Sequence, residues 1–565
     1  MALYEYGVTF NGRRVVHPGA YSEIDATDMV VATSGNASLP VLMGASTAGV
    51  PNKLVWFTDP DLAKAYLRGG DLYNAIDLVF SPAPGGGSGV SAVGVMPVNA
   101  LVQAALTSGT STFKSKEYGD GGNKISVSLS NGSISGTYKI GTFRWDLNTV
   151  ESFDNLGAVM QLQYTGTSAY AEVNVTVVNN IATQLQTKIG STSGTAVADV
   201  TLDLTTGQYS TIQDIVTYFS SISNYTVDYV SYWNYNLSTS LLDALSAVPI
   251  KTVNYLKAVS ADIEKQINGY SNLISITTTG TPTILPSTYL IGGVVGATPA
   301  SWATQFDSLK SVVSNILIPL TASPAIHAEA LAHVSIMEQK KQLQMLFVGG
   351  SIGETVVQTK QRAATLDSSR AVLCYPGIYH KSINNGFTVA PSYFTAVMIV
   401  GIMCGLDVAE PITFKYLDLI GIENDYLVGD ADIDDLITSG VCMLERVLSG
   451  GIRIVQGITT YTDINNTLYR EISVRRVADY ISSKMTTKLE DTYVGKKGTT
   501  TNITAVTSTV KEVLTEALTN DQIVAYKDIV VTFSDTVVTV DYKVAPVEPI
   551  DYILVTSHFI PSSKF

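Results

Sequence analysis

The stretch that organises the chain runs from Gly450 to Met485 and reads GGIRIVQGITTYTDINNTLYREISVRRVADYISSKM. After the opening glycine pair, Ile452, Ile454 and Ile458 form an apolar strand pattern with polar residues between them. A polar loop follows, and then apolar residues recur at helical spacing: Val474, Val477, Ala478, Ile481, Met485 and Leu489. The pattern predicts a buried strand, a turn and a docked amphipathic helix, a unit with no chemistry of its own.

Basic residues accompany this predicted helix. Arg475 and Lys484 flank its apolar face, Arg476 is expected opposite that face, and Lys488 follows one turn after Lys484. The cluster stands out because the formal net charge of the whole chain is −14. Two interpretations stay open: a solvated face without function, or a face that docks on an acidic partner and sets its register.

The segments around this unit come in a distinctive order. APSYFTAVMIVGIMCGLDVAEPITFKYLDLIGI (390–422) is followed by DIDDLITSGVCMLERVLSGGIRI (432–454) and then by the double arginine, while VVHPGAYSEID (15–25) lies near the start. An apolar small-residue helix, an acidic helix, a glycine-led strand and I-x-V-R-R in this order resemble contractile bacteriophage tail sheath proteins. The resemblance covers about residues 1–60 and 290–565 and is weak between them.

The resemblance implies a structural protein rather than an enzyme, with no catalytic residue, no cofactor and no metal site. Copies are expected to stack as hexameric rings around an inner tail tube and to contract, driving the tube through the host envelope. The implied partners are other copies, the tube protein, and baseplate and tail terminator proteins. The implied location is the virion tail, after assembly in the host cytoplasm. The sheath of a bacterial contractile injection system is the alternative within this class.

Composition agrees with a protein that buries surface against partners. Charged residues make up 15% of the chain, against about 25% in typical soluble domains. The strongly acidic balance argues against a nucleic-acid binder, which needs a basic footprint. The most apolar window, Tyr393 to Leu406, is too short to span a bilayer and predicts a core helix instead of a membrane anchor.

The predicted fold class is an α/β core with inserted domains and extended terminal arms. Within the core, strand Leu343–Val348, helix Glu354–Leu366 and strand Ala371–Tyr375 form the clearest βαβ unit. The predicted domains are an arm at 1–30, a discontinuous α/β core at 31–96 and 291–450, an all-β insertion at 97–190, a mixed α/β insertion at 191–290, and a C-terminal sheath domain with its arm at 451–565. Asn131-Gly132 between alternating runs marks a hairpin in the first insertion.

Both termini show strand alternation without a nearby hairpin partner. The apolar positions are Tyr4, Tyr6 and Val8 at one end and Ile550, Tyr552 and Leu554 at the other. A lone strand leaves backbone N–H and C=O groups unpaired, and an edge strand of another chain can satisfy them. These residues are therefore the candidates for inter-subunit strand addition, and Arg475, Arg476, Lys484 and Lys488 are the candidates for facing the tube.

One motif offers an enzymatic alternative. The run from Gly349 to Gly353 matches G-x-S-x-G between an apolar strand and a helix, as the nucleophile elbow of a serine hydrolase does. Asp367, Asp407 and His558 follow Ser351 in the chain order of a triad. No HGGG-like oxyanion segment precedes the motif, and a glycine-rich turn at the end of any βαβ strand gives the same pattern. The sequence favours the turn.

Overall fold

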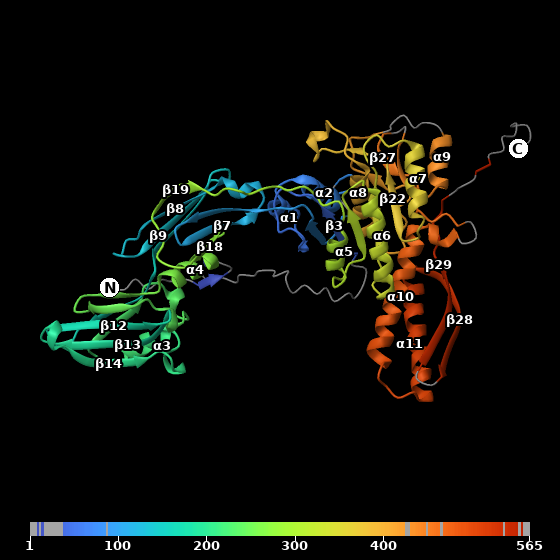
Figure 1. Cartoon of the computed structure of the whole chain (residues 1–565). Coiled ribbons are helices and arrows are strands. Elements are labelled where there is room, and N and C mark those ends of the chain that lie inside the picture. The colour runs from blue at the N-terminus through green and yellow to red at the C-terminus, as the bar shows by residue number, and fades with distance from the viewer. Residues whose placement is uncertain are drawn as a thin grey trace, which may run out of the picture. The chain divides into compact units, whose positions relative to one another are not determined.

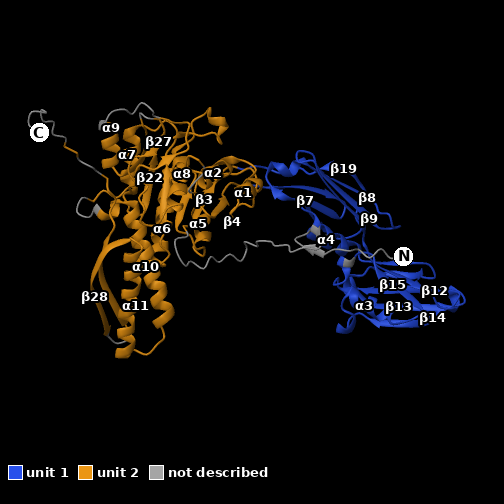
Figure 2. Ribbon diagram, turned by 180° about the vertical axis from the view of Figure 1, so that it is seen from behind, with its two compact units in different colours: residues 1–23, 101–296 blue, residues 24–100, 297–565 orange. Residues whose placement is uncertain are grey.

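The computed structural model describes residues 8–10, 13–15, 38–85, 89–423, 430–447, 450–463, 467–534, 537–551 and 555–556. The chain divides into two compact units, shown in Figure 2. Unit 1 comprises residues 1–23 and 101–296, and unit 2 comprises residues 24–100 and 297–565.

Unit 2 is built on a nine-stranded sheet. Its order is β24 (Tyr416–Leu417), β27 (Ile452–Ile454), β26 (Val441–Arg446), β22 (Ala371–Tyr375), β21 (Met345–Gly349), β20 (Ile316–Pro319), β3 (Pro40–Gly44), β5 (Val93–Pro97) and β4 (Val55–Phe57). The strands from β26 to β5 are parallel, and those outside them are antiparallel. The parallel strands are continuous apolar runs because helices cover both faces of the sheet.

Two sets of helices cover the sheet. On one face lie α1 (Pro60–Leu67), α2 (Gly70–Phe80) and α8 (Ser392–Cys404). On the other lie α5 (Ala303–Leu309), α6 (Pro324–Gln339), α7 (Val356–Leu366) and α9 (Asp430–Thr438). Alternation along β3 serves both faces: Leu42 joins the first core, whereas Val41 and Met43 join the second. The α/β class is confirmed, and so is the βαβ unit β21–α7–β22, whose strands pair in parallel.

Helix α8 is buried over almost its whole length, as predicted for a core helix. Within the described part of the chain, no helix combines the length and the apolar character that a membrane crossing requires. Beyond the carboxyl ends of the parallel strands, two short strands, β23 (Ile378–Tyr379) and β25 (Gly421–Ile422), pair antiparallel and close a loop region.

Unit 1 contains one β domain inserted into another. The first has β6 (Gln103–Ser108), β7 (Ser111–Tyr118), β8 (Ile125–Asn131), β9 (Tyr138–Arg144), β10 (Thr149–Leu156), α4 (Val259–Tyr270), β18 (Ile274–Thr278) and β19 (Leu285–Tyr289) around one core. Nested within it are β11 (Ala158–Tyr164), β12 (Tyr170–Val178), β13 (Ile181–Gly190), β14 (Val197–Asp203), α3 (Ile212–Ser220), β15 (Tyr225–Tyr229), β16 (Leu245–Pro249) and β17 (Asn254–Lys257) around a second core. The hairpin predicted at Asn131-Gly132 is the β8–β9 pair.

The domain boundary predicted at residue 190 is wrong. Strand β13 ends at Gly190 and pairs with β14 directly after it, so the boundary falls inside one sheet. Residues 241–270 have a helical period throughout, but their first half is not helical. That half forms β16 and β17, which complete sheets begun by β12 and β11 about 80 residues earlier, and only α4 is helical.

The C-terminal part of unit 2 is a layer of two helices and a β-hairpin (Figure 1). Helices α10 (Ile472–Tyr493) and α11 (Thr500–Thr519) pack on β28 (Ile523–Ser534) and β29 (Val537–Pro546) around their own small core. The buried residues of α10 include Val474, Val477, Ile481 and Met485, which confirms the predicted apolar face.

At the N-terminus, β1 (Val8–Phe10) pairs antiparallel with β2 (Arg13–Val15), and Val8 lies opposite Val15. The prediction that the strand around Val8 has no local hairpin partner is therefore wrong. Tyr4 and Tyr6 lie outside the described residues. At the other end, Ile550 is described and exposed, whereas Tyr552 and Leu554 lie outside the described residues.

Candidate functional site

The G-x-S-x-G motif is a turn between β21 and α7. Ser351 is exposed, and its backbone N–H donates to Glu354 Oε1 at 3.1 Å. Asp367 caps the far end of the eleven-residue helix α7, about 16 Å along the helix axis, so it is not brought to Ser351. His558 lies outside the described residues. Asp407 follows the far end of the thirteen-residue helix α8 (Ser392–Cys404), whose start contacts the turn. Within the described residues, neither acid is therefore brought to Ser351.

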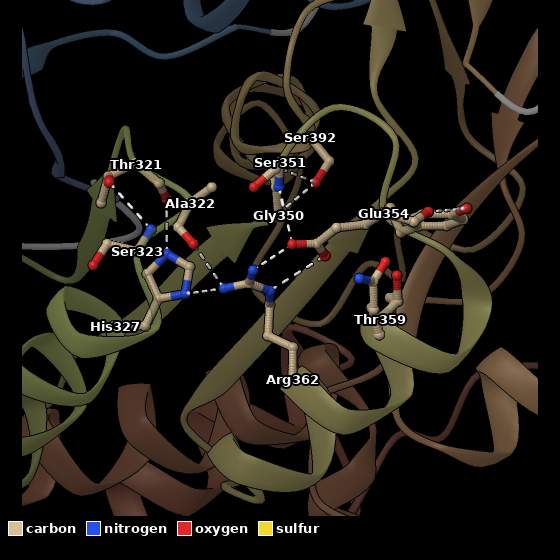
Figure 3. A network of polar contacts seen from close by, with 12 residues as sticks. Thr321, Ala322, Ser323, His327, Gly350, Ser351, Glu354, Thr359, Arg362 and Ser392 are labelled. Carbon is tan, nitrogen blue, oxygen red and sulfur yellow. Dashed lines mark hydrogen bonds and ion pairs between the residues drawn. The ribbon is translucent and has the colours of Figure 1, made fainter.

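Close packing against α8 accounts for Gly349 in this turn and for Ser392, the serine at the start of α8. A Cβ on Gly349 would lie 2.1 Å from the backbone N of Tyr393, so only glycine lets α8 approach the strand end. Ser392 at the start of α8 is buried, and its Oγ accepts from Gly350 N at 2.6 Å (Figure 3). The turn is thus a docking point between β21 and α8.

A polar network fixes the same region from the other side (Figure 3). Arg362 forms an ion pair with Glu354 and donates from Nη1 to Ala322 O at 2.9 Å and to His327 Nδ1 at 3.3 Å. His327 donates from Nε2 to Thr321 O at 2.8 Å, so the ring is neutral with its proton on Nε2. Burial lowers the pKa of His327 to about 4. The network joins α6, α7 and the loop after β20.

Replacing Ser351 by alanine is expected to leave the fold and assembly unchanged, because only its backbone N–H is engaged. The matched variant Ser392→Ala removes a buried acceptor from Gly350 N and is expected to cost about 1–3 kcal/mol of unfolding free energy. Urea unfolding of both variants measures the difference. A stable Ser351→Ala protein that has lost assembly would contradict the structural assignment of this serine.

The buried His327 predicts a pH dependence of stability. Its pKa in the folded state lies below the ordinary 6.5, so the unfolded state takes up the proton first as the pH falls. The contribution of His327 to the free energy of unfolding is therefore present in full above pH 6.5. This contribution is smaller by about 2 kcal/mol at pH 5 and stops falling near pH 4. Urea unfolding of the wild type and His327→Gln at pH 7 and 5 checks this contribution, and an equal pH dependence of the two proteins would contradict it.

The structure distributes the basic residues of α10 over different environments. Arg475 pairs with Asp479 on the same helix at 2.7 Å. The two lysines pair with glutamates of α11: Lys488 with Glu512 at 2.9 Å, and Lys484 with Glu516. Arg476 is only 9% exposed and donates to Asp407 O at 3.2 Å. Arg476 lies opposite the predicted apolar face, but the segment after α8 covers that side of α10 as well, so Arg476 is not part of a solvated face.

The β28–β29 hairpin is incompletely covered in the described structure. Within the described residues its strands pair only with each other, which leaves two open edges. Its large exposed side chains are Val524, Val530, Phe533, Val537 and Val538, which are between 38% and 65% exposed. The run IVAYKDIVVTF in β28 is rich in β-branched and aromatic residues, as is typical of a strand.

The segment after this hairpin is fixed at its root. Val547 N donates to Gln522 O at 3.3 Å, and Gln456 Nε2 donates to Asp551 Oδ2 at 2.8 Å and to Glu471 Oε1 at 3.0 Å. Between these two anchors Ile550 is 83% exposed. Residues 547–551 are therefore fixed beside the start of α10.

Comparisons with known proteins agree with the resemblance. The family described as phage tail sheath protein central domain matches residues 296–460, and the phage tail sheath C-terminal domain matches residues 465–560. A tail sheath protein of Bacillus phage SP01 is 48% identical over 563 residues, which cover 100% of this chain and 99% of that protein. A putative tail sheath protein of Enterococcus phage phiEF24C is 28% identical over 97% of both chains.

Solved structures show the same fold. The crystal structure of a sheath tail protein from Desulfitobacterium hafniense has a TM-score of 0.56 at 13% identity and covers 95% of this chain and 97% of its own. A sheath tail protein from Listeria innocua also has a TM-score of 0.56, at 12% identity, and covers 92% of this chain and 93% of its own.

A relative with 48% identity along the full length establishes the family, and its members are structural proteins. The serine hydrolase alternative is therefore wrong, in agreement with the geometry around Ser351. The chain belongs to the phage tail sheath protein family, whose members form part of the virion tail.

Proposed function

We propose that many copies of this chain polymerise as hexameric rings around an inner tail tube and that the polymer contracts to drive the tube through the host envelope. The observation that carries this proposal is the β28–β29 hairpin, with its two open edges and its exposed apolar side chains. A two-stranded hairpin is marginal by itself, and open edges invite pairing with another chain. The identity with a phage tail sheath protein supports the phage tail over an injection device.

The terminal segments supply the strands for these edges. The donors are the N-terminal segment with Tyr4, Tyr6 and Val8 and the C-terminal segment with Ile550, Tyr552 and Leu554. Val8 uses one edge of its strand for β2, and the other edge of that strand can still pair. Each added ladder bond contributes about 0.5–1.5 kcal/mol net, so four or five bonds hold neighbours together while the subunits rotate as rigid bodies.

This mechanism needs no nucleotide, because the free energy of contraction is stored in the contacts between subunits. Sedimentation of the purified chain over a range of concentrations tests the proposal. Above a critical concentration the protein is expected to sediment as long polymers. A chain that stays monomeric at every concentration would contradict it.

We also propose that the paired surface of α10 and α11 faces the tube, with baseplate and terminator proteins closing the two ends of the polymer. Arg475 and Arg476 are engaged in contacts within the chain. Of the four basic residues predicted to face the tube, Lys484 and Lys488 therefore remain as candidates, with side chains that are 29% and 34% exposed. Their partners Glu512 and Glu516 give this surface a mixed charge that can set register.

Reversing both charges, Lys484→Glu with Lys488→Glu, is expected to weaken binding of the polymer to the tube about 10-fold at low salt and less at 0.5 M salt, where exposed charges are screened. The matched control reverses Lys114 and Lys139, two exposed lysines of unit 1. Co-sedimentation of tube with sheath measures the effect. Equal binding by both double variants at every salt concentration would show that the α10 lysines are merely solvated.

A further inference from the structure

A closed loop follows β22 at the carboxyl edge of the sheet. Its neck is an antiparallel bridge in which Ile378 N donates to Ala390 O at 3.0 Å and Ala390 N donates to Ile378 O at 2.7 Å. His380 and Ile383 are buried and anchor the loop from inside. The loop therefore has a fixed base and its own small core, as compact surface loops do.

The tip of this loop is held in an unusual backbone conformation. Asn384, Asn385 and Gly386 all have positive φ, at 47°, 54° and 77°. Backbone bonds from Gly386 N to Ile383 O at 2.9 Å and from Phe387 N to Asn384 O at 3.1 Å close the turn. Consecutive left-handed residues are costly and persist where the surroundings impose them, most often at functional surfaces.

This turn presents Phe387, which is 84% exposed. Ile420, 55% exposed, lies beside the turn, since its Cδ1 is 2.4 Å from the place of a Cβ on Gly386. The Asn384 Nδ2 to Thr388 Oγ1 bond, 2.9 Å long, stiffens the backbone on both sides of the ring. An aromatic side chain on a rigid base loses little entropy on docking, which is the property of interface anchors.

A groove that can accept such a ring lies between α7 and α9. Its volume is about 520 Å³, and it is lined by Val357, Lys360, Gln361, Ala364, Thr438, Ser439 and Thr462. Val357 is 64% exposed within its helix, and Lys360 pairs with Asp435 of α9 at 2.9 Å. The groove thus offers apolar surface between two helices tied together by an ion pair.

The loop lies at the carboxyl edge of the sheet, whereas the groove runs along α7 and reaches the amino edge. Phe387 belongs to the loop that leaves the carboxyl end of β22. Ser439 lies two residues before β26, and Thr460 N donates to Ala371 O at the amino end of β22. Phe387 and the part of the groove at the amino edge therefore cannot meet within one chain. Between copies they produce a head-to-tail contact, which continues into an open assembly rather than closing as a dimer.

We propose that Phe387 of one copy inserts into the α7–α9 groove of another copy. This contact rests on the proposed function, in which the chain polymerises with itself, and it adds a contact between cores to the one made by the terminal strands. The occupant of the groove is a second copy, because Phe387 and the groove belong to the same domain of a chain that assembles with itself, and they are kept apart within one copy.

Removing the ring tests the contact. Phe387→Ser is expected to raise the critical concentration for polymerisation about 30-fold, the loss that truncation of a buried aromatic anchor gives, whereas Phe387→Leu raises it less. Val178→Ser is the matched control, because Val178 is an exposed apolar residue of unit 1 at 52%. Both sites are exposed, so thermal unfolding of the three variants is expected to match the wild type.

Cross-linking identifies the receiving surface. A mixture of Phe387→Cys and Ala364→Cys copies is expected to form a disulfide-linked pair on oxidation, and neither variant alone is expected to do so. The native Cys374 and Cys442 are fully buried and do not compete, and the partly exposed Cys404 is replaced by serine in both variants.

The outcomes separate this contact from the proposed function. Failure of the unmodified chain to polymerise would overturn both. Normal polymers of Phe387→Ser without a cross-linked product would overturn the contact alone. Impaired assembly of Phe387→Ser without the cross-link would overturn the groove as its receiver.

Discussion

Removal of residues 1–15 is expected to leave a folded monomer that does not polymerise. Strands β1 and β2 pair only with each other in the described residues. Removing them therefore breaks no other described strand pair, whereas a neighbour loses the strand that we assign to it. Circular dichroism and thermal unfolding are expected to match the full chain, while sedimentation is expected to show monomer at every concentration.

A length-matched control replaces residues 1–15 by glycine and serine. It is expected to fail in the same way, because the apolar anchors and the strand propensity are lost while the length of chain is kept. The arm assignment would be contradicted by a truncated protein that still forms long sheaths, or by one that does not fold.

Arg362→Met is expected to destabilise unit 2 by about 3–5 kcal/mol, since it leaves Glu354 without its ion-pair partner in a largely buried place. Both side chains are only 11% exposed, and Ala322 O and His327 Nδ1 lose a donor as well. Urea unfolding measures the loss of free energy. The double variant Glu354→Gln with Arg362→Met is expected to recover part of it, because no buried charge is left unpaired.

Lys360→Met is the control on the same helix. Lys360 forms an ion pair with Asp435, and their side chains are 36% and 62% exposed, respectively. An exposed pair of this kind contributes about 0–1 kcal/mol to the free energy of unfolding. A loss below 1 kcal/mol for Arg362→Met, or equal losses for the two variants, would show that the network does not hold α6 and α7 together.

Local patterns in the sequence predicted the core of unit 2 well. Continuous apolar runs identified β21 and β22 as buried parallel strands. Asp59 followed by Pro60 is a local pattern of the same kind, a capping residue and a proline at the start of α1. The Asp59 carboxylate does accept from Asp61 N and Leu62 N. Each of these signals lies within a few residues of the structure that it specifies, so the sequence is enough.

The misses come from pairings between distant residues. Residues 245–257 have a helical period, but β12 and β11 recruit them as strands, and neighbouring strands override local propensity. In the same way Arg476 is buried by the chain that leaves α8, some 70 positions earlier. The nested domains of unit 1 and the unfinished edges of the β28–β29 hairpin likewise depend on contacts that no local pattern contains.

The register between copies in the assembled polymer, seen by electron cryomicroscopy, tests the central claim most directly. The account predicts that β28 or β29 of each copy carries an additional strand, hydrogen-bonded along its open edge and contributed by the N- or C-terminal segment of a neighbour. Hairpins that remain two-stranded throughout the polymer, with both terminal segments packed on their own subunit, would contradict it.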